Sequence, residues 1–144
     1  MHSLKKDVKI NIVGIQTVNG EREVVEVFTE GNYCEKNGCY YISYMETEET
    51  GFAGAKTTLK VDKDKEKVVL LRSKPAESQL VIEKGGRHLC SYNTGYGNVM
   101  IGISGTKITS HLNEKGGSLD FKYTMDMESA LLSINEIHMK IEEC

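Results

Sequence analysis

The sequence contains no tryptophan, a single proline and only four cysteines in 144 residues. It also lacks any run approaching the ~18–20 apolar residues of a transmembrane helix, which argues against a helical membrane protein. Residues 1–15 carry Lys5, Lys6 and Lys9 and contain no apolar stretch of the kind that a signal peptide needs. We therefore expect a cytoplasmic protein whose cysteines stay free thiols in a reducing compartment.

An excess of positive charge is missing as well. Lys and Arg number 18 against 21 Asp and Glu, so the formal net charge is −3. A nucleic-acid-binding protein needs a basic face that displaces counterions, so no nucleic-acid partner is expected. The apolar fraction of 39% and the charged fraction of 27% are typical of a globular protein. The length predicts one domain over residues 1–144.

Apolar and polar residues alternate along most of the chain. Leu119, Phe121, Tyr123, Met125 and Met127 alternate with polar residues, which predicts a strand with one buried face. Short turn-forming segments separate such runs. The predicted strands cover residues 8–17, 22–33, 39–46, 56–61, 67–72, 78–83, 87–92, 97–110, 117–127 and 131–142.

The turns and irregularities are also visible in the sequence. Asn37-Gly38 favours a type I′ hairpin, because both residues adopt positive φ readily. Gly95-Tyr96-Gly97 lacks the context of a phosphate-binding loop and is predicted to join two strands. The alternation changes phase near Gly14, which indicates a β-bulge or a strand that passes between environments. A second irregularity is expected near Asn135 and Glu136, and helix is limited to a turn around residues 47–54.

Ten strands with short connections predict an all-β, antiparallel, up-and-down architecture. Closure into a single β-barrel of about 8–10 strands would remove the exposed strand edges. A two-sheet sandwich is the structural alternative.

Five segments, in their order and spacing, resemble the YwiB-like family of uncharacterised bacterial β-barrel proteins. They are 36–46 (KNGCYYISYME), 56–61 (KTTLKV), 71–73 (LRS), 92–97 (YNTGYG) and 116–123 (GGSLDFKY). The resemblance implies a calycin or lipocalin-like barrel and carries over no activity. Lys74 and Gly95 depart from the family pattern, which has Gly and Pro there. The Gly-x-Trp signature of secreted lipocalins is absent, since Gln16 follows Gly14 by two positions.

The cysteines and histidines do not form a recognisable reactive or metal-binding set. Pairing across the Asn37-Gly38 turn places Cys34 and Cys39 diagonally, roughly 7–8 Å apart. A disulfide at that separation would be strained, and a zinc site would need further ligands. None of the four histidines stands at a ligand or catalytic spacing. No metal, no cofactor and no enzymatic activity are therefore predicted.

Several polar side chains share a strand face with core residues. Tyr44 and Glu46 are in phase with Ile42, and Arg72 is in phase with Val68 and Leu70. If these faces point inward, Arg72 needs a partner, because an isolated buried charge is costly. That partner is either Glu46 and tyrosine hydroxyls, or the carboxylate or phosphate of a bound molecule. Val69 and Leu71 would suit the opposite facing. The candidate ligand-binding residues are Tyr44, Glu46, Arg72, Tyr92 and Tyr123.

These observations predict a cytoplasmic barrel that binds a small amphipathic or acidic ligand in its interior. Small barrels of this size enclose room for one ligand. The alternative is a structural barrel with a filled core, or a non-enzymatic protein–protein interaction module. The predicted partner is a small molecule, and neither nucleic acid nor a membrane is expected to bind. The sequence leaves open whether the protein forms a homo-oligomer.

Overall fold

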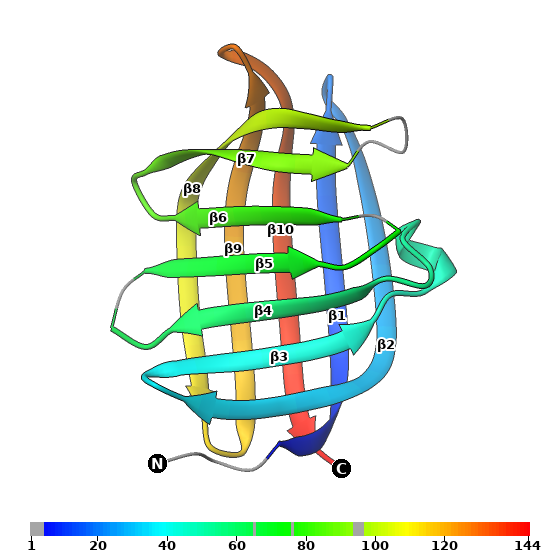
Figure 1. Cartoon of the computed structure of the whole chain (residues 1–144), viewed down its shortest axis with the longest axis vertical. Coiled ribbons are helices and arrows are strands. Elements are labelled where there is room, and N and C mark those ends of the chain that lie inside the picture. Colours follow the sequence, from blue (N-terminus) through cyan, green and yellow to red (C-terminus); the bar gives the residue numbers. More distant parts are fainter. Residues whose placement is uncertain (1–4, 65, 76, 94–96) are drawn as a thin grey trace.

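The computed structural model describes residues 5–64, 66–75, 77–93 and 97–144, which form a single antiparallel sheet with up-and-down connections (Figure 1). All ten predicted strands are confirmed, together with the single helical turn. Along the sheet the order is β6-β5-β4-β3-β2-β1-β10-β9-β8-β7. The elements are β1 Lys6–Val18, β2 Glu21–Lys36, β3 Cys39–Met45, the 3₁₀ turn η1 Glu48–Thr50, β4 Lys56–Asp62, β5 Lys67–Arg72, β6 Ser78–Glu83, β7 Arg87–Asn93, β8 Asn98–Asn113, β9 Gly116–Met127 and β10 Ala130–Glu143.

The local turn chemistry behaves as the sequence predicts at the β2–β3 hairpin. Asn37 and Gly38 have φ values of 51° and 77°, which are the two positive values of a type I′ turn. Lys36 pairs with Cys39, and Cys34 pairs with Tyr41, so the predicted register is confirmed. Two residues of the turn predicted at 95–97, Gly95 and Tyr96, lie outside the described residues.

The two predicted strand irregularities have different outcomes. β1 pairs with β2 and β10 without a register shift around Gly14, so the predicted β-bulge at this position is wrong. The alternative prediction holds, because β1 leaves the packed core here and continues as part of the wall of a pocket. The irregularity expected near Asn135 and Glu136 lies earlier, between Leu131 and Ser133. Leu132 is the extra residue of a β-bulge, and regular alternation resumes at Ser133, before the chain reaches Asn135. The position predicted from the sequence was therefore a few residues too late.

The strands cross in two orientations, and β2 bends from one into the other (Figure 1). At this bend Gly31 lies so close to β3 that a Cβ would overlap the carbonyl oxygen of Ser43. The barrel is nearly closed, since β6 and β7 form no regular ladder among the described residues. The turn between them closes the gap: Gly85 N donates to Gly105 O at 3.0 Å and Gly105 N donates to Gly86 O at 3.2 Å.

On β5 the face that carries Val68, Leu70 and Arg72 points into the barrel. Val68 and Leu70 are buried, whereas Leu71 is 41% exposed, so the opposite facing is wrong. One end of the barrel is densely packed. Its fully buried side chains include Ile10, Tyr33, Ile42, Leu119, Met139 and Ile141. The described residues contain no helix with the length and apolar character needed to traverse a membrane.

Candidate ligand-binding site

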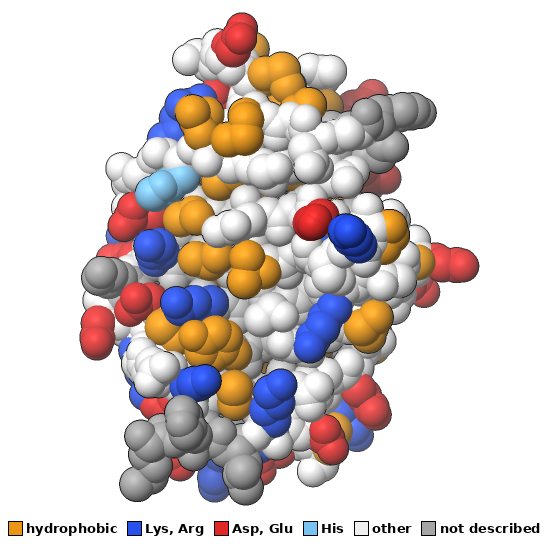
Figure 2. Space-filling model, in the orientation of Figure 1, with side chains coloured by type: hydrophobic (Ala, Val, Ile, Leu, Met, Phe, Trp, Pro, Cys, Tyr) orange, Lys and Arg blue, Asp and Glu red, His pale blue; other side chains and the backbone are white. Residues whose placement is uncertain are grey.

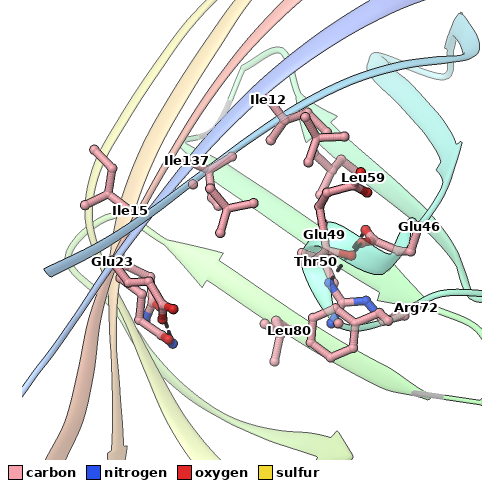
Figure 3. Close-up of a pocket in the computed structure, with 18 of the residues that line it drawn as sticks. Ile12, Ile15, Glu23, Glu46, Glu49, Thr50, Leu59, Arg72, Leu80 and Ile137 are labelled. Carbon is pink, nitrogen blue, oxygen red and sulfur yellow. Dashed lines mark hydrogen bonds and ion pairs between the residues drawn. The ribbon is translucent and has the colours of Figure 1, made fainter.

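The other end of the barrel contains a cavity of about 450 Å³ (Figure 3). Its volume lies in the range of small-molecule sites. Apolar side chains from six strands form most of its wall: Ile12, Val27, Leu59, Leu70, Leu80, Phe121 and Met125. All five candidate residues also line it: Tyr44, Glu46, Arg72, Tyr92 and Tyr123. The structure therefore brings together residues that are up to eighty positions apart in the sequence.

Arg72 is the last residue of β5, and its side chain is only 9% exposed. Its Nε donates a hydrogen bond to Thr57 Oγ1 at 3.3 Å. Its guanidinium carbon lies 3.9 Å from the ring centroid of Phe52, in a cation–π arrangement. The ion pair with Glu46 is long, with 4.0 Å between Nη2 and Oε1. Neither terminal NH₂ group donates a hydrogen bond to a residue that the structure describes.

The Glu46 carboxylate is buried but well satisfied without Arg72. Thr57 Oγ1 donates to its Oε1 at 2.9 Å, and Thr50 Oγ1 donates to its Oε2 at 2.6 Å. The second of these hydroxyls belongs to η1, so the short helical turn is tied to the wall of the cavity. Arg72 and Glu46 form the predicted ion pair, but it is long, and the Thr57 hydroxyl bridges the two side chains. The terminal NH₂ groups of Arg72 are therefore not used by this pairing as hydrogen-bond donors.

The tyrosines bring phenol groups to the same wall. Burial raises the pKa of Tyr44 above its usual value, and the neighbouring Glu46 carboxylate raises it further. Burial also raises the pKa of Tyr123 to about 12, with Tyr92 adding to the rise and Arg72 opposing it. Among the described residues, no acceptor receives a hydrogen bond from the hydroxyl of Tyr92 or Tyr123. The raised pKa keeps the phenols of Tyr44 and Tyr123 neutral at physiological pH.

A second group of polar side chains, Gln16, Glu23 and Asn135, also lines the cavity. Figure 3 shows Glu23 across the cavity from Arg72. Gln16 Nε2 donates to Asn135 Oδ1 at 3.2 Å, and Asn135 Nδ2 donates to Ser133 Oγ at 2.9 Å. Glu23 pairs with Gln16 across β1 and β2, and all three lining residues face inward.

Sequence reasoning missed this second group, and it also missed Thr57 and Phe52. Gln16 is in phase with Ile10 and Ile12, and Thr57 is in phase with Leu59, so strand alternation contained a usable signal for both. Phe52 lies in the loop after η1, where no periodicity exists to place it.

The thiols and imidazoles lie away from this cavity. All four cysteines are free, and Cys90 is buried behind β6, where Val81 N donates to its Sγ at 3.3 Å. His88 interacts with Glu83 at 2.9 Å and His138 with Asp120 at 2.7 Å, on half-exposed outer positions. Within the part of the chain that the structure covers, no cluster of three His, Cys, Asp or Glu residues could hold a metal ion.

Comparison with known proteins gives consistent matches. A family model described as "Domain of unknown function (DUF1934)" matches residues 10–139. The uncharacterized beta-barrel protein YwiB of Bacillus subtilis (strain 168) is 26% identical over 118 residues, which cover 82% of this chain and 80% of that protein. The crystal structure of the ywiB protein from Bacillus subtilis superimposes with a TM-score of 0.86 at 22% identity, covering 99% of this chain and 95% of that one.

Proposed function

The chain belongs to the family described as DUF1934, a domain of unknown function, and from that premise we propose that it is a cytoplasmic binding protein without enzymatic activity. The resemblance to YwiB-like barrels is confirmed, and that family brings no activity with it. The function proposed here is to hold one small amphipathic acid inside the barrel.

The observation that carries this proposal is the unused donor capacity of Arg72. A guanidinium offers five N–H donors in a planar fork that matches a carboxylate or phosphate. Only the Nε hydrogen of Arg72 is used by a described residue, although the side chain is almost fully buried. Burying a charge without hydrogen-bond partners is costly, so an acidic group in the cavity would compensate that cost.

The remainder of the cavity suits the apolar body of such a ligand. Leu59, Leu70 and Leu80 project from three adjacent strands into it. The phenol groups of Tyr92 and Tyr123 provide two further donors beside the guanidinium. An apolar lining with a few convergent polar groups is typical of a small-molecule site.

The first test is native mass spectrometry of the protein purified gently from its own cells. A reproducible small adduct that is released on denaturation would support the proposal and identify the chemical class of the ligand. A bare mass, repeated after the purified protein is incubated with medium-chain fatty acids, would contradict it.

The role of Arg72 is tested with the double variant Glu46→Gln and Arg72→Gln, which removes both buried charges and leaves neither unpaired. We expect it to fold and to lose the adduct. Arg22→Gln removes an exposed arginine of β2 and should retain the adduct. A folded double variant that keeps the adduct would show that Arg72 has only a structural role.

A second candidate function is protein–protein interaction through the outside of the barrel. Leu89 on β7 and Met100 on β8 are 64% and 57% exposed, and Figure 2 shows hydrophobic side chains on the face of the molecule that carries β3 to β7. Exposed apolar patches mark interaction sites. The same native spectra test this candidate, because a dimer or a bound protein would appear at a higher mass.

A further inference from the structure

The charges that line the cavity do not favour a simple anion. The described lining residues include four glutamates, Glu23, Glu46, Glu48 and Glu49, and a single cation, Arg72. None of Glu23, Glu48 and Glu49 forms an ion pair with a described residue. A ligand that carried only negative charge would gain at Arg72 and be repelled by the carboxylates at the mouth.

The charges are also separated in space. Arg72 lies beside Glu46 and Thr50 on one side of the cavity, and Glu23 lies on the other side (Figure 3). Glu46 already accepts two threonine hydrogen bonds. Glu23, in contrast, stands at an inward position of β2 beside the amide of Gln16.

The amides next to Glu23 each have one of their two N–H groups directed to a neighbouring side chain. Gln16 Nε2 is directed to Asn135 Oδ1, and Asn135 Nδ2 is directed to Ser133 Oγ. The only charged group on this side among the described lining residues is the Glu23 carboxylate, which can only accept hydrogen bonds. The side that holds Arg72 presents the donors of its terminal NH₂ groups and of the nearby phenols, beside the Glu49 carboxylate and a Glu46 carboxylate that already accepts two hydrogen bonds.

We propose that the ligand is bipolar, with an acidic group held by Arg72 and a cationic ammonium group held by Glu23, joined by an apolar spacer. This inference rests on the function proposed above and narrows its ligand class to zwitterionic amphiphiles. Figure 3 shows Ile137 and Leu80 between Glu23 and Arg72, so an apolar surface is available there for the spacer. Such a molecule would give Glu23 a cationic partner and would accept hydrogen bonds from the terminal NH₂ groups of Arg72.

The test compares three matched probes by isothermal titration calorimetry at low ionic strength: octanoic acid, octylamine and ω-aminooctanoic acid. We expect ω-aminooctanoic acid to bind about tenfold or more tightly than either single-charge probe, which corresponds to one additional partly buried ion pair. The preference should decrease as salt is added, because screening weakens the interaction at the cavity mouth.

Two glutamine variants on the same strand locate the effect. Glu23→Gln should bring the affinities for ω-aminooctanoic acid and octanoic acid close together. Glu30→Gln is the matched control, because Glu30 lies on the outer face of β2 and should leave the preference unchanged.

The outcomes separate the two proposals. Equal binding of the acid and the amino acid, both lost in the charge-neutral variant of Glu46 and Arg72, would overturn the bipolar ligand and leave the acid-binding function standing. Binding of octylamine that persists in that variant would overturn both. Failure of all three probes to bind would also overturn both.

Discussion

At the scale of single residues, Thr57 organises the cavity wall. Its side chain is fully buried, and its hydroxyl donates to Glu46 while accepting from Arg72. A direct bidentate ion pair would occupy the guanidinium, whereas this arrangement holds the two charges 4.0 Å apart and leaves the terminal NH₂ groups unoccupied. A buried ion pair is by itself weak evidence for stability. The threonine therefore matters more for the position of Arg72 than the ion pair does.

Substitution Thr57→Val tests this position. The variant keeps the shape of the side chain but removes the hydroxyl, so we expect a loss of about 1–3 kcal/mol in the free energy of unfolding, measured by urea denaturation. Affinity for an acidic ligand should also decrease. Thr124→Val, at an outward position of β9 where no described residue is hydrogen-bonded to the hydroxyl, should change stability by about 0.5 kcal/mol or less. Equal effects of the two variants would contradict the role of the Thr57 hydroxyl.

At the scale of elements, closure of the barrel depends on close backbone approach between strands. Gly105 of β8 lies against the β6–β7 turn, and the two are joined by backbone hydrogen bonds to Gly85 and Gly86. A Cβ at Gly105 would overlap the carbonyl group of Glu83. Since β6 and β7 share no regular ladder among the described residues, this backbone contact joins the two edges of the sheet together with side-chain bonds such as Val81 N to Cys90 Sγ and Asn93 N to Ser78 Oγ.

Gly105→Ala should therefore destabilise the barrel by about 1–3 kcal/mol, because the strands must move apart to admit the methyl group. Gly14→Ala is the matched control. A Cβ there would meet Ile137 Cδ1 at 3.7 Å, which is an ordinary contact. We expect this control to be neutral or stabilising by up to about 1 kcal/mol. Thermal denaturation of both variants makes the comparison, and a tolerated Gly105→Ala would show that closure does not depend on this contact.

At the scale of the whole molecule, the barrel is packed at one end and hollow at the other. The packed end contains the stacked rings of Tyr33 and Tyr40, whose centroids are 5.7 Å apart, and the Tyr33 hydroxyl donates to Asn113 O at 2.7 Å. The hollow end lacks comparable filling and is lined by Gly14 and Val25. The densely packed core and the cavity of the proposed ligand site thus lie at different ends of one barrel.

This division predicts that the cavity can be filled without unfolding the protein. Val25→Phe adds a ring at an inward position opposite Gly14, where the wall has no side chain. We expect at least about tenfold weaker ligand binding, with the melting temperature unchanged or higher. Val24→Phe makes the same change on the outer face, where Val24 is 55% exposed, and should leave binding intact. Equal binding by both variants would place the ligand elsewhere.

Strand positions could be predicted from the sequence, and so could the face that the candidate polar residues share with core residues on the same strand. Alternation with a period of two states which side chains point the same way, and Asn37-Gly38 sets a hairpin register by its own backbone preferences. Both signals are local, so they persist without knowledge of the rest of the chain. They put Arg72 in phase with Val68 and Leu70, and Tyr123 in phase with Leu119 and Phe121, but they left open whether the face of Arg72 points inward.

Tertiary structure alone decided which end of the barrel is hollow, what mediates the Arg72–Glu46 pair and what faces Arg72 across the cavity. Thr57, Phe52 and Glu23 acquire their roles only when strands far apart in sequence curve around a common interior. A void depends on the volume that side chains leave unfilled once the sheet has closed. Alternation states which residues of a strand share a face, but it does not state whether residues of distant strands meet.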